Sequence, residues 1–174
     1  EFAMAVNLSP RQLVDPDFHR KVIDILGREQ LRPCSLELEI TESTMLLPDA
    51  TAIDNLKRLR EIGVKVALDD FGMGHTSLHY LRELPLDTVK IDRSLADVSP
   101  GSVNEHIVRS IADLSRTLNL TLVVEGVETD QQLERLSALG CDRFQGYFFS
   151  RPLAAGGCLD FILDANRKRR FAAS

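Results

Sequence analysis

The 174-residue chain has no tryptophan, few aromatic residues, only three cysteines and no long apolar run. No stretch approaches the ~20 consecutive apolar residues that a membrane-spanning helix needs, and the start does not resemble a secretory signal. Cys34, Cys141 and Cys158 are far apart and lack CxxC spacing, which argues against a disulfide framework or a zinc knuckle. We therefore expect reduced thiols and a cytoplasmic location, with any membrane attachment elsewhere in a parent protein.

Excess positive charge is also missing. The net charge of −5 argues against binding to a DNA or RNA polymer, because phosphate backbones select strongly basic surfaces. With 44% hydrophobic residues, the chain can bury a core and is expected to form a single domain over residues 1–174. The first four residues, EFAM (1–4), resemble a remnant of cloning.

Short apolar runs alternate with longer amphipathic segments along the chain. The length and β-branched content of the short runs predict six strands, at AVNL (5–8), LELEIT (36–41), VKVALDD (64–70), TVKID (88–92), LTLVVEG (120–126) and RFQGYFF (143–149). Strands that alternate with helices form parallel βα units. Six units fit an open doubly wound sheet, or an α/β barrel of TIM type that lacks two of its eight strands.

The predicted helices carry recognisable start and stop signals. Ser9-Pro10 places a capping hydroxyl before a proline, and Thr129 with Gln132 has the spacing of a capping box. A third helix is predicted over 49–62, and Gly63 follows it as a stop signal before the next strand.

Each predicted strand ends in polar residues. Because the carboxyl ends of parallel strands meet at one rim, these side chains are expected to converge; they are Asn7, Glu39, Asp69, Asp70, Lys90, Asp92, Glu125 and Gln145. Alternation strengthens the prediction, since Glu37, Glu39 and Thr41 share one face of their strand. Taken singly, each of these residues is more often a solvated side chain or a cap.

Carboxylates from several strands need a counter-charge if they are buried together. Mg²⁺ or Mn²⁺ suits carboxylate and amide ligands, and two such ions about 3.5–4 Å apart commonly serve phosphoester hydrolysis. Asp69 beside Asp70 could be shared between them. A Schiff-base lyase that uses Lys90 remains an alternative from these residues alone.

Six motifs together resemble the EAL domain family, the cyclic di-GMP phosphodiesterases that fold as a modified TIM barrel. They occur in the family's order, as VNLSPRQL (6–13), LELEITES (36–43), ALDDFGMGHTSL (67–78), VKIDRSL (89–95), VVEGVET (123–129) and QGYFFSRPL (145–153). The resemblance implies that a water molecule activated by two metal ions attacks one phosphodiester bond of cyclic di-GMP and opens the ring to linear pGpG.

The resemblance also implies a role for each matching residue. Asn7, Glu39 and Asp69 would bind the first metal, with Asp69 bridging to a second that Asp70 helps to hold. Glu125 would be both a catalytic residue and a metal ligand, and Lys90 would orient or deprotonate the attacking water. Three further residues would assist, namely Asp92 and Gln145 in the substrate groove and Glu42 as support for the loop after the aspartate pair.

The chain departs from the family pattern in two places. The loop has Met73, His75 and Thr76 where the family commonly has Thr, Tyr and Ser, and the Glu-Ala-Leu signature itself is absent. That signature carries a metal-binding glutamate, so an N-terminally truncated domain with weak or no hydrolysis is expected. An alternative is an inactive module that senses cyclic di-GMP or binds proteins. An open barrel leaves two sheet edges unpaired, which predicts a homodimer, and the parent protein is expected to carry sensory or cyclase-like domains.

Overall fold

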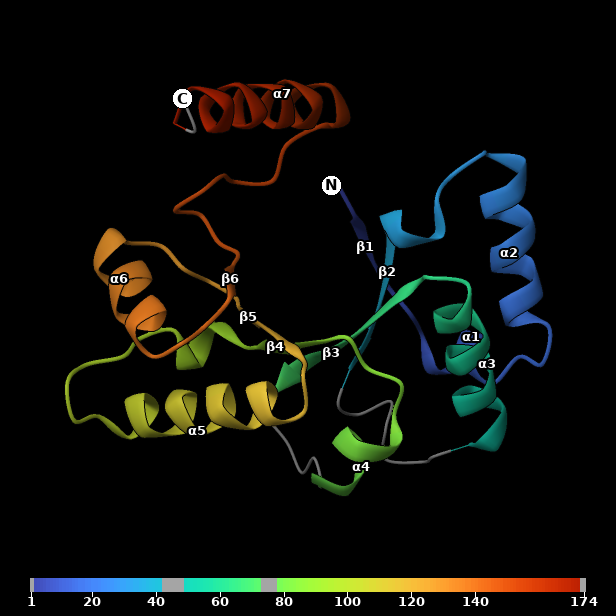
Figure 1. The fold of residues 1–174 in the computed structure, drawn as a ribbon, viewed down its shortest axis with the longest axis horizontal. Coiled ribbons are helices and arrows are strands. Elements are labelled where there is room, and N and C mark those ends of the chain that lie inside the picture. The colour runs from blue at the N-terminus through green and yellow to red at the C-terminus, as the bar shows by residue number, and fades with distance from the viewer. Residues whose placement is uncertain (1, 42–48, 73–77, 173–174) are drawn as a thin grey trace.

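The structure is a computed structural model that describes residues 2–41, 49–72 and 78–172. Six parallel strands form one sheet in the order of the chain (Figure 1). They are β1 (Met4–Asn7), β2 (Leu36–Thr41), β3 (Lys65–Phe71), β4 (Thr88–Ile91), β5 (Thr121–Val124) and β6 (Arg143–Phe144). A doubly wound sheet reverses its strand order at a switch point, so that alternative is wrong. The α/β fold with an incomplete TIM-type barrel is confirmed.

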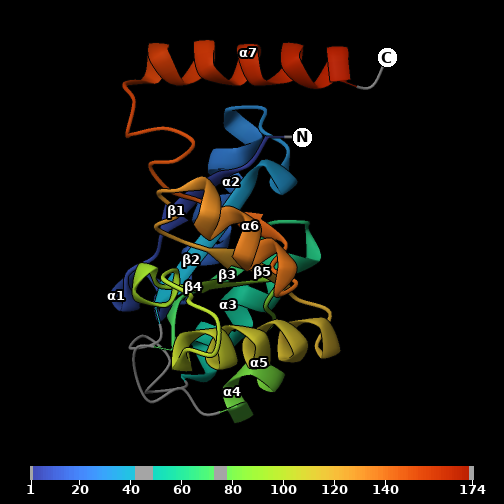
Figure 2. The ribbon, with the colours of Figure 1, turned by 90° about the vertical axis from the view of Figure 1, so that its left-hand side faces the viewer.

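Helices follow the strands along the chain. They are α1 (Pro10–Leu13), α2 (Phe18–Arg28), α3 (Ala50–Glu61), α4 (Leu78–Glu83), α5 (Val103–Thr117), α6 (Asp130–Ala138) and α7 (Ala155–Ala172), with short 3₁₀ turns η1 (Pro33–Ser35) and η3 (Arg93–Leu95). In both views α7 stands apart from the sheet (Figures 1 and 2). Within the described residues, none of the helices has the length and apolar character to cross a membrane.

The helix starts confirm the capping predictions. Ser9 and Thr129 each accept a hydrogen bond from the backbone N–H three residues on, and the glutamine at that position completes a capping box. Asp49 caps α3 by accepting from the N–H of Thr51. Each cap satisfies a backbone donor that the first helical turn leaves without a partner.

The strands alternate between two faces as predicted. In β2, Leu38 and Ile40 are buried in the hydrophobic core, while Glu39 lies on the opposite face, beside Asn7 of β1 in register. In β2 the outward face therefore holds the apolar residues, and the concave face holds Glu39.

The last predicted strand is too long. β6 ends at Phe144, whereas the sequence predicts a strand over 143–149. The amide of Gln145 still donates to Val124 O, at 2.9 Å, but the amides of Phe148 and Phe149 bond to Val127 O and Gly146 O in a turn. The apolar run here therefore belongs to a turn against the loop after β5.

A buried polar contact joins the first helices to α3. Asn55 is 1% exposed and donates to the carbonyls of Leu13 and Asp15, at 2.9 and 2.8 Å. Its Oδ1 lies 2.7 Å from Nδ1 of His19. Because both amide protons of Asn55 are used, His19 Nδ1 is the donor in this contact. The contact fixes the segment between β1 and β2.

Candidate active site

Lys90 of β4 is the centre of a buried ionic cluster. Its Nζ lies 2.6 Å from Glu39 Oε1 and 3.6 Å from Asp69 Oδ1, and it also contacts the carboxylate of Glu125. The side chains of Lys90 and Glu39 are 7% and 9% exposed. The three acidic residues come from β2, β3 and the residue after β5. The strand ends thus converge on one buried ammonium group.

The protonation of the cluster follows from burial and charge. Burial favours the neutral form of Lys90, but hydrogen bonds with Glu125 and Glu39 outweigh it and raise the Lys90 pKa above its ordinary value. Burial raises the pKa of Glu125, opposed by Lys90 and aided by the charges of Asp69 and Glu39. Lys90 is therefore an ammonium ion that partly neutralises three acids.

A β-bulge shapes the aspartate pair. The register between β3 and β4 shifts between Leu68 and Phe71, so Asp69 and Asp70 together stand opposite Lys90. Asp70 has a φ of 56°, in the left-handed region that aspartate tolerates better than most residues. Its amide donates to Asp69 Oδ1 at 3.0 Å. The bulge makes room for two acids where the partner strand has one residue.

The bulge also changes the side-chain order of β3. In a regular strand, Phe71 would share the face of Asp69. The extra residue returns Phe71 to the face of Leu68, and both are buried in the core. Asp69 is partly buried and Asp70 is exposed at the rim. The bulge therefore lets two acids reach the rim without sending Phe71 to the polar face.

The loops after β5 and β6 interlock beside Glu125. The Glu125 amide donates to Ile91 O, and the Val127 amide donates to Gln145 O at 3.0 Å. An added Cβ at Gly146 would stand 2.1 Å from Val127 O. Only glycine permits this approach, so Gly146 helps to fix the backbone that presents Glu125.

The other predicted site residues lie outside the ionic cluster. Asp92 caps η3, accepting from Ser94 N at 2.8 Å, and this hydrogen bond lowers the Asp92 pKa. Asn7 and Gln145 are exposed at the ends of β1 and β6. Glu42 falls outside the described residues, as do Met73, His75 and Thr76. The cluster thus joins four of the predicted residues.

The donor chemistry of this rim fits a hard divalent cation. Three carboxylates face one ammonium group at low exposure, which leaves negative charge to be balanced. Carboxylate and amide oxygens are the ligands that Mg²⁺ and Mn²⁺ take. In the present conformation no three His, Cys, Asp or Glu side chains of the described residues are arranged to hold a metal ion. Lys90 stands among the carboxylates instead.

Two features of the site were not foreseen from the sequence. The bulge has one sequence signal, two adjacent acids before Phe71 in an otherwise alternating strand. The sequence predicted that Lys90 and these acids lie at one rim, but not that Lys90 contacts Glu39, Asp69 and Glu125 directly.

The fold and site define an open parallel α/β barrel with an acidic rim around a buried lysine. The family profile described as "EAL domain" matches residues 1–152. The chain belongs to the EAL domain family, as the motifs indicated.

Known proteins support this assignment. The cyclic di-GMP phosphodiesterase NbdA of Pseudomonas aeruginosa is 42% identical over 171 residues, which is 98% of this chain and 21% of NbdA. The chain spans roughly a fifth of the length of this curated relative. The phosphodiesterase MucR of the same organism, solved in complex with c-di-GMP, superposes with a TM-score of 0.84 at 41% identity, covering 90% of this chain and 70% of that one.

A further solved relative contains a metal. Klebsiella pneumoniae BlrP1, in a complex with manganese and cyclic di-GMP, is 34% identical with a TM-score of 0.77, and the match covers 86% of this chain and 39% of that one. EAL relatives thus include phosphodiesterases and complexes with a divalent metal.

Proposed function

We propose that this chain is part of a cyclic di-GMP phosphodiesterase domain, in which water opens one phosphodiester bond to give linear pGpG. One observation carries the proposal, the contact of Lys90 with acids from three strand ends. The substrate is inferred from relatives whose names specify cyclic di-GMP. A Schiff-base lyase has less support, because a Schiff-base amine must be unprotonated and the Lys90 pKa is raised.

The acidic rim would hold two cations, Mg²⁺ or Mn²⁺. The first would take Asn7, Glu39 and Asp69, and the second Asp69 and Asp70, with Glu125 beside them. When bound, such a pair supplies a nucleophilic water at neutral pH and neutralises charge on the phosphodiester. The register supports this assignment, because Asn7 lies beside Glu39 on neighbouring strands.

Lys90 would act by position and charge. Its ammonium group can donate hydrogen bonds to the attacking water and to phosphate oxygens. It could serve as a base only when cations draw its carboxylate partners away, because those partners raise its pKa in the present arrangement. Glu125 would help to orient the water, while Asp92 and Gln145 would line the substrate groove and Glu42 would support the loop after the aspartates.

A specific observation favours a second candidate, a module that binds cyclic di-GMP without hydrolysing it. The Glu-Ala-Leu signature, which the family resemblance associates with a metal-binding glutamate, does not occur in the sequence. We expect hydrolysis by this chain alone to be weak or absent. Residues 1–174 would form one EAL-type unit, and a homodimer and additional sensory or cyclase-like domains in a parent protein belong to the same proposal.

The test is a single-turnover assay with protein in excess over cyclic di-GMP, in Mg²⁺ or Mn²⁺, with pGpG measured by chromatography. Calorimetry with cyclic di-GMP runs in parallel. Glu125→Gln is expected to reduce hydrolysis by about 10² or more and to keep binding. Glu128→Gln is the matched control, because Glu128 is exposed on the same loop.

Each outcome decides between the candidates. Slow hydrolysis that Glu125→Gln abolishes and Glu128→Gln preserves supports the phosphodiesterase. Binding without any pGpG in either metal supports the sensing module. A chain that neither binds nor hydrolyses cyclic di-GMP contradicts both.

A further inference from the structure

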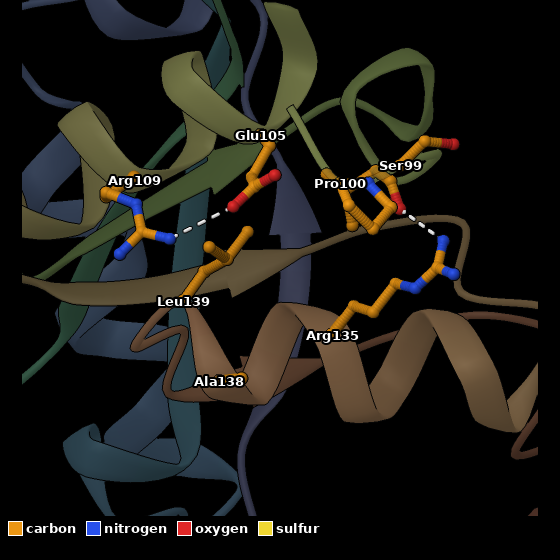
Figure 3. Close-up of a pocket in the computed structure, with 8 residues that line it drawn as sticks. Ser99, Pro100, Glu105, Arg109, Arg135, Ala138 and Leu139 are labelled. Carbon is orange, nitrogen blue, oxygen red and sulfur yellow. Dashed lines mark hydrogen bonds and ion pairs between the residues drawn. The ribbon is translucent and has the colours of Figure 1, made fainter. Parts of the chain in front are cut away.

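A small cavity lies between α5, α6 and the segment that leads into α5. It has a volume of about 160 Å³ and is lined by Val98, Ser99, Pro100, Glu105, Arg109, Arg135, Ala138 and Leu139. Figure 3 shows Arg109 from α5 and Arg135 from α6 with Leu139 and Pro100 in view between them. None of these residues belongs to the proposed active site.

Among the charged residues that line the cavity, one arginine has no carboxylate partner within the described part of the chain. Glu105 Oε1 pairs with Arg109 at 3.0 Å, and its Oε2 accepts from the amide of Gly101 at 2.6 Å. The Gly101 amide and the Arg109 guanidinium hold the Glu105 pKa below its ordinary value, so this carboxylate is charged and each of its oxygens accepts a hydrogen bond. Arg135 donates to the carbonyl of Val98 at 2.8 Å. Across the described residues, no acid pairs with Arg135.

Arg135 therefore has donors to offer a ligand. A guanidinium carries five N–H donors, and the hydrogen bond to Val98 uses Arg135 Nη1. Arg135 is half-buried, and the side chain of Arg109 is 55% exposed. A partly buried guanidinium selects a carboxylate or a phosphate, to which it can donate two parallel hydrogen bonds.

The size of the cavity and its apolar lining limit the class of ligand that it can bind. Val98 and Leu139 are 2% and 8% exposed, and with Ala138 and Pro100 they give the cavity apolar walls. Its volume corresponds to about five water molecules, well below the ~300 Å³ at which pockets begin to hold drug-sized ligands. A short aliphatic chain with one anionic head matches this volume and these walls.

We propose that this cavity binds a short-chain aliphatic carboxylate, with its head on Arg135 and its chain against Val98 and Leu139. Arg109 balances the charge of Glu105, so Arg135 supplies the net positive charge that attracts the carboxylate ligand. The ligand would contact the segment that runs from η3 into α5, which begins at Asp92 directly after the strand of Lys90. The site is independent of the proposed phosphodiesterase function.

The test is NMR titration of the ¹⁵N-labelled chain with sodium butyrate, at constant ionic strength kept with sodium chloride. The amide signals of Ser99 and Gly101 are expected to shift and saturate with a dissociation constant on the order of millimolar. Butyramide has the same shape without the charge, and it should cause no saturable shift. Arg135→Gln should weaken butyrate binding about tenfold or more, because it removes a charge-assisted hydrogen bond.

Two further variants keep the test decisive. Arg58→Gln is the control for a lost helical arginine, because Arg58 is exposed and pairs with Asp54 on α3, away from the cavity. It should leave butyrate binding unchanged. Ala138→Leu fills the cavity from α6 without removing charge and should also weaken binding. The absence of saturation, equal binding of butyramide, or unchanged binding in both Arg135→Gln and Ala138→Leu would overturn the proposal.

Discussion

Lys90 Nζ lies 2.6 Å from Glu39 Oε1, although the two residues are 51 positions apart and β3 separates their strands. The contact spans β3 because the curved parallel sheet turns both side chains toward the same concave face. Asp69 of the intervening strand lies 3.6 Å from the same ammonium group. Three neighbouring strands thus share one counter-ion, and the stability of the rim depends on it.

Replacement of Lys90 by methionine should destabilise the fold by about 3–5 kcal/mol at pH 7, because it leaves buried acids without their cation. The pKa of Lys90 is higher in the folded chain than in the unfolded chain. The ammonium group therefore stabilises the fold fully at any pH below the pKa of Lys90 in the unfolded chain, and this stabilisation is lost only as the pH rises through its pKa in the folded chain. When the ammonium group is removed, burial and the charges of Asp69 and Glu39 all favour the protonated form of Glu125. Because protonation removes one of the buried charges, the destabilisation by Lys90→Met should be smaller at pH 5 than at pH 7. Urea unfolding at both pH values measures it.

Lys65→Met is the control for the Lys90 variant. The Lys65 side chain is 50% exposed and lies 3.4 Å from Asp87, so its removal should cost no more than about 1 kcal/mol. Added Mn²⁺ should restore part of the stability of Lys90→Met and none of that of Lys65→Met. A Lys90→Met protein as stable as the Lys65→Met protein would show that the ionic cluster is not buried in solution.

The left-handed backbone at Asp70 predicts an unusual order of stability. Asp70→Gly should be more stable than Asp70→Ala by about 1 kcal/mol, because glycine adopts a φ of 56° without steric cost. At Lys57, an exposed position in α3, the order should reverse, because alanine favours helix. Thermal unfolding of the four variants measures both differences. The same order at both positions would argue against the bulge.

Gly146→Ala should disrupt the loops beside Glu125. The added Cβ would stand 2.1 Å from Val127 O and 2.4 Å from Val127 N, so the backbone must move. We expect destabilisation of about 1–3 kcal/mol and weaker cyclic di-GMP binding, measured by denaturant unfolding and calorimetry. Gly27→Ala in α2 has open space around its Cβ and should be neutral or slightly stabilising. Equal stability of the two variants would contradict the close approach of these loops.

Cys141 predicts a pH dependence at alkaline pH. Burial, with a contribution from Asp142, raises the pKa of Cys141 to about 12 from an ordinary value of 9.0. The unfolded chain loses this thiol proton first, so the unfolding free energy should fall as the pH rises from 9 toward 12. The Cys141→Ala variant should lack this part of the decrease in unfolding free energy with pH. Urea unfolding between pH 8 and 10.5 compares the two proteins.

Thiol labelling gives an independent readout of the same burial. At pH 8 the folded chain should react with iodoacetamide more slowly at Cys141 than at Cys158, because Cys141 is buried and Cys158 is half-buried. Urea should remove the difference. Rapid labelling of Cys141 in the folded protein would contradict its burial.

Much of the fold could be predicted from local sequence. Strand β2 has the predicted bounds, Leu36–Thr41, because its alternating pattern is period two throughout. The capping boxes at Ser9 and Thr129 also depend on residues only three apart. The prediction for β6 was wrong because its apolar residues follow Gly146 into a turn, and apolar content does not distinguish a turn from a strand.

Part of the site could be predicted in the same way. Asp69 and Lys90 were expected at one rim because parallel strands deliver their ends together. The positions of Asn7, Asp92 and Gln145 outside the ionic cluster could not be predicted, because each depends on the local backbone where its strand ends. Asp92, for example, is used to cap η3.

The sequence by itself determined the alternation of strands and helices, the polar face and the family, because these follow from periodicity and from motifs within single segments. Only the tertiary structure decided that Lys90 touches Glu39, Asp69 and Glu125. It also decided that a bulge places Asp69 and Asp70 opposite one residue. Sheet curvature and strand register set these contacts, and both are properties of strands packed together rather than of any one segment.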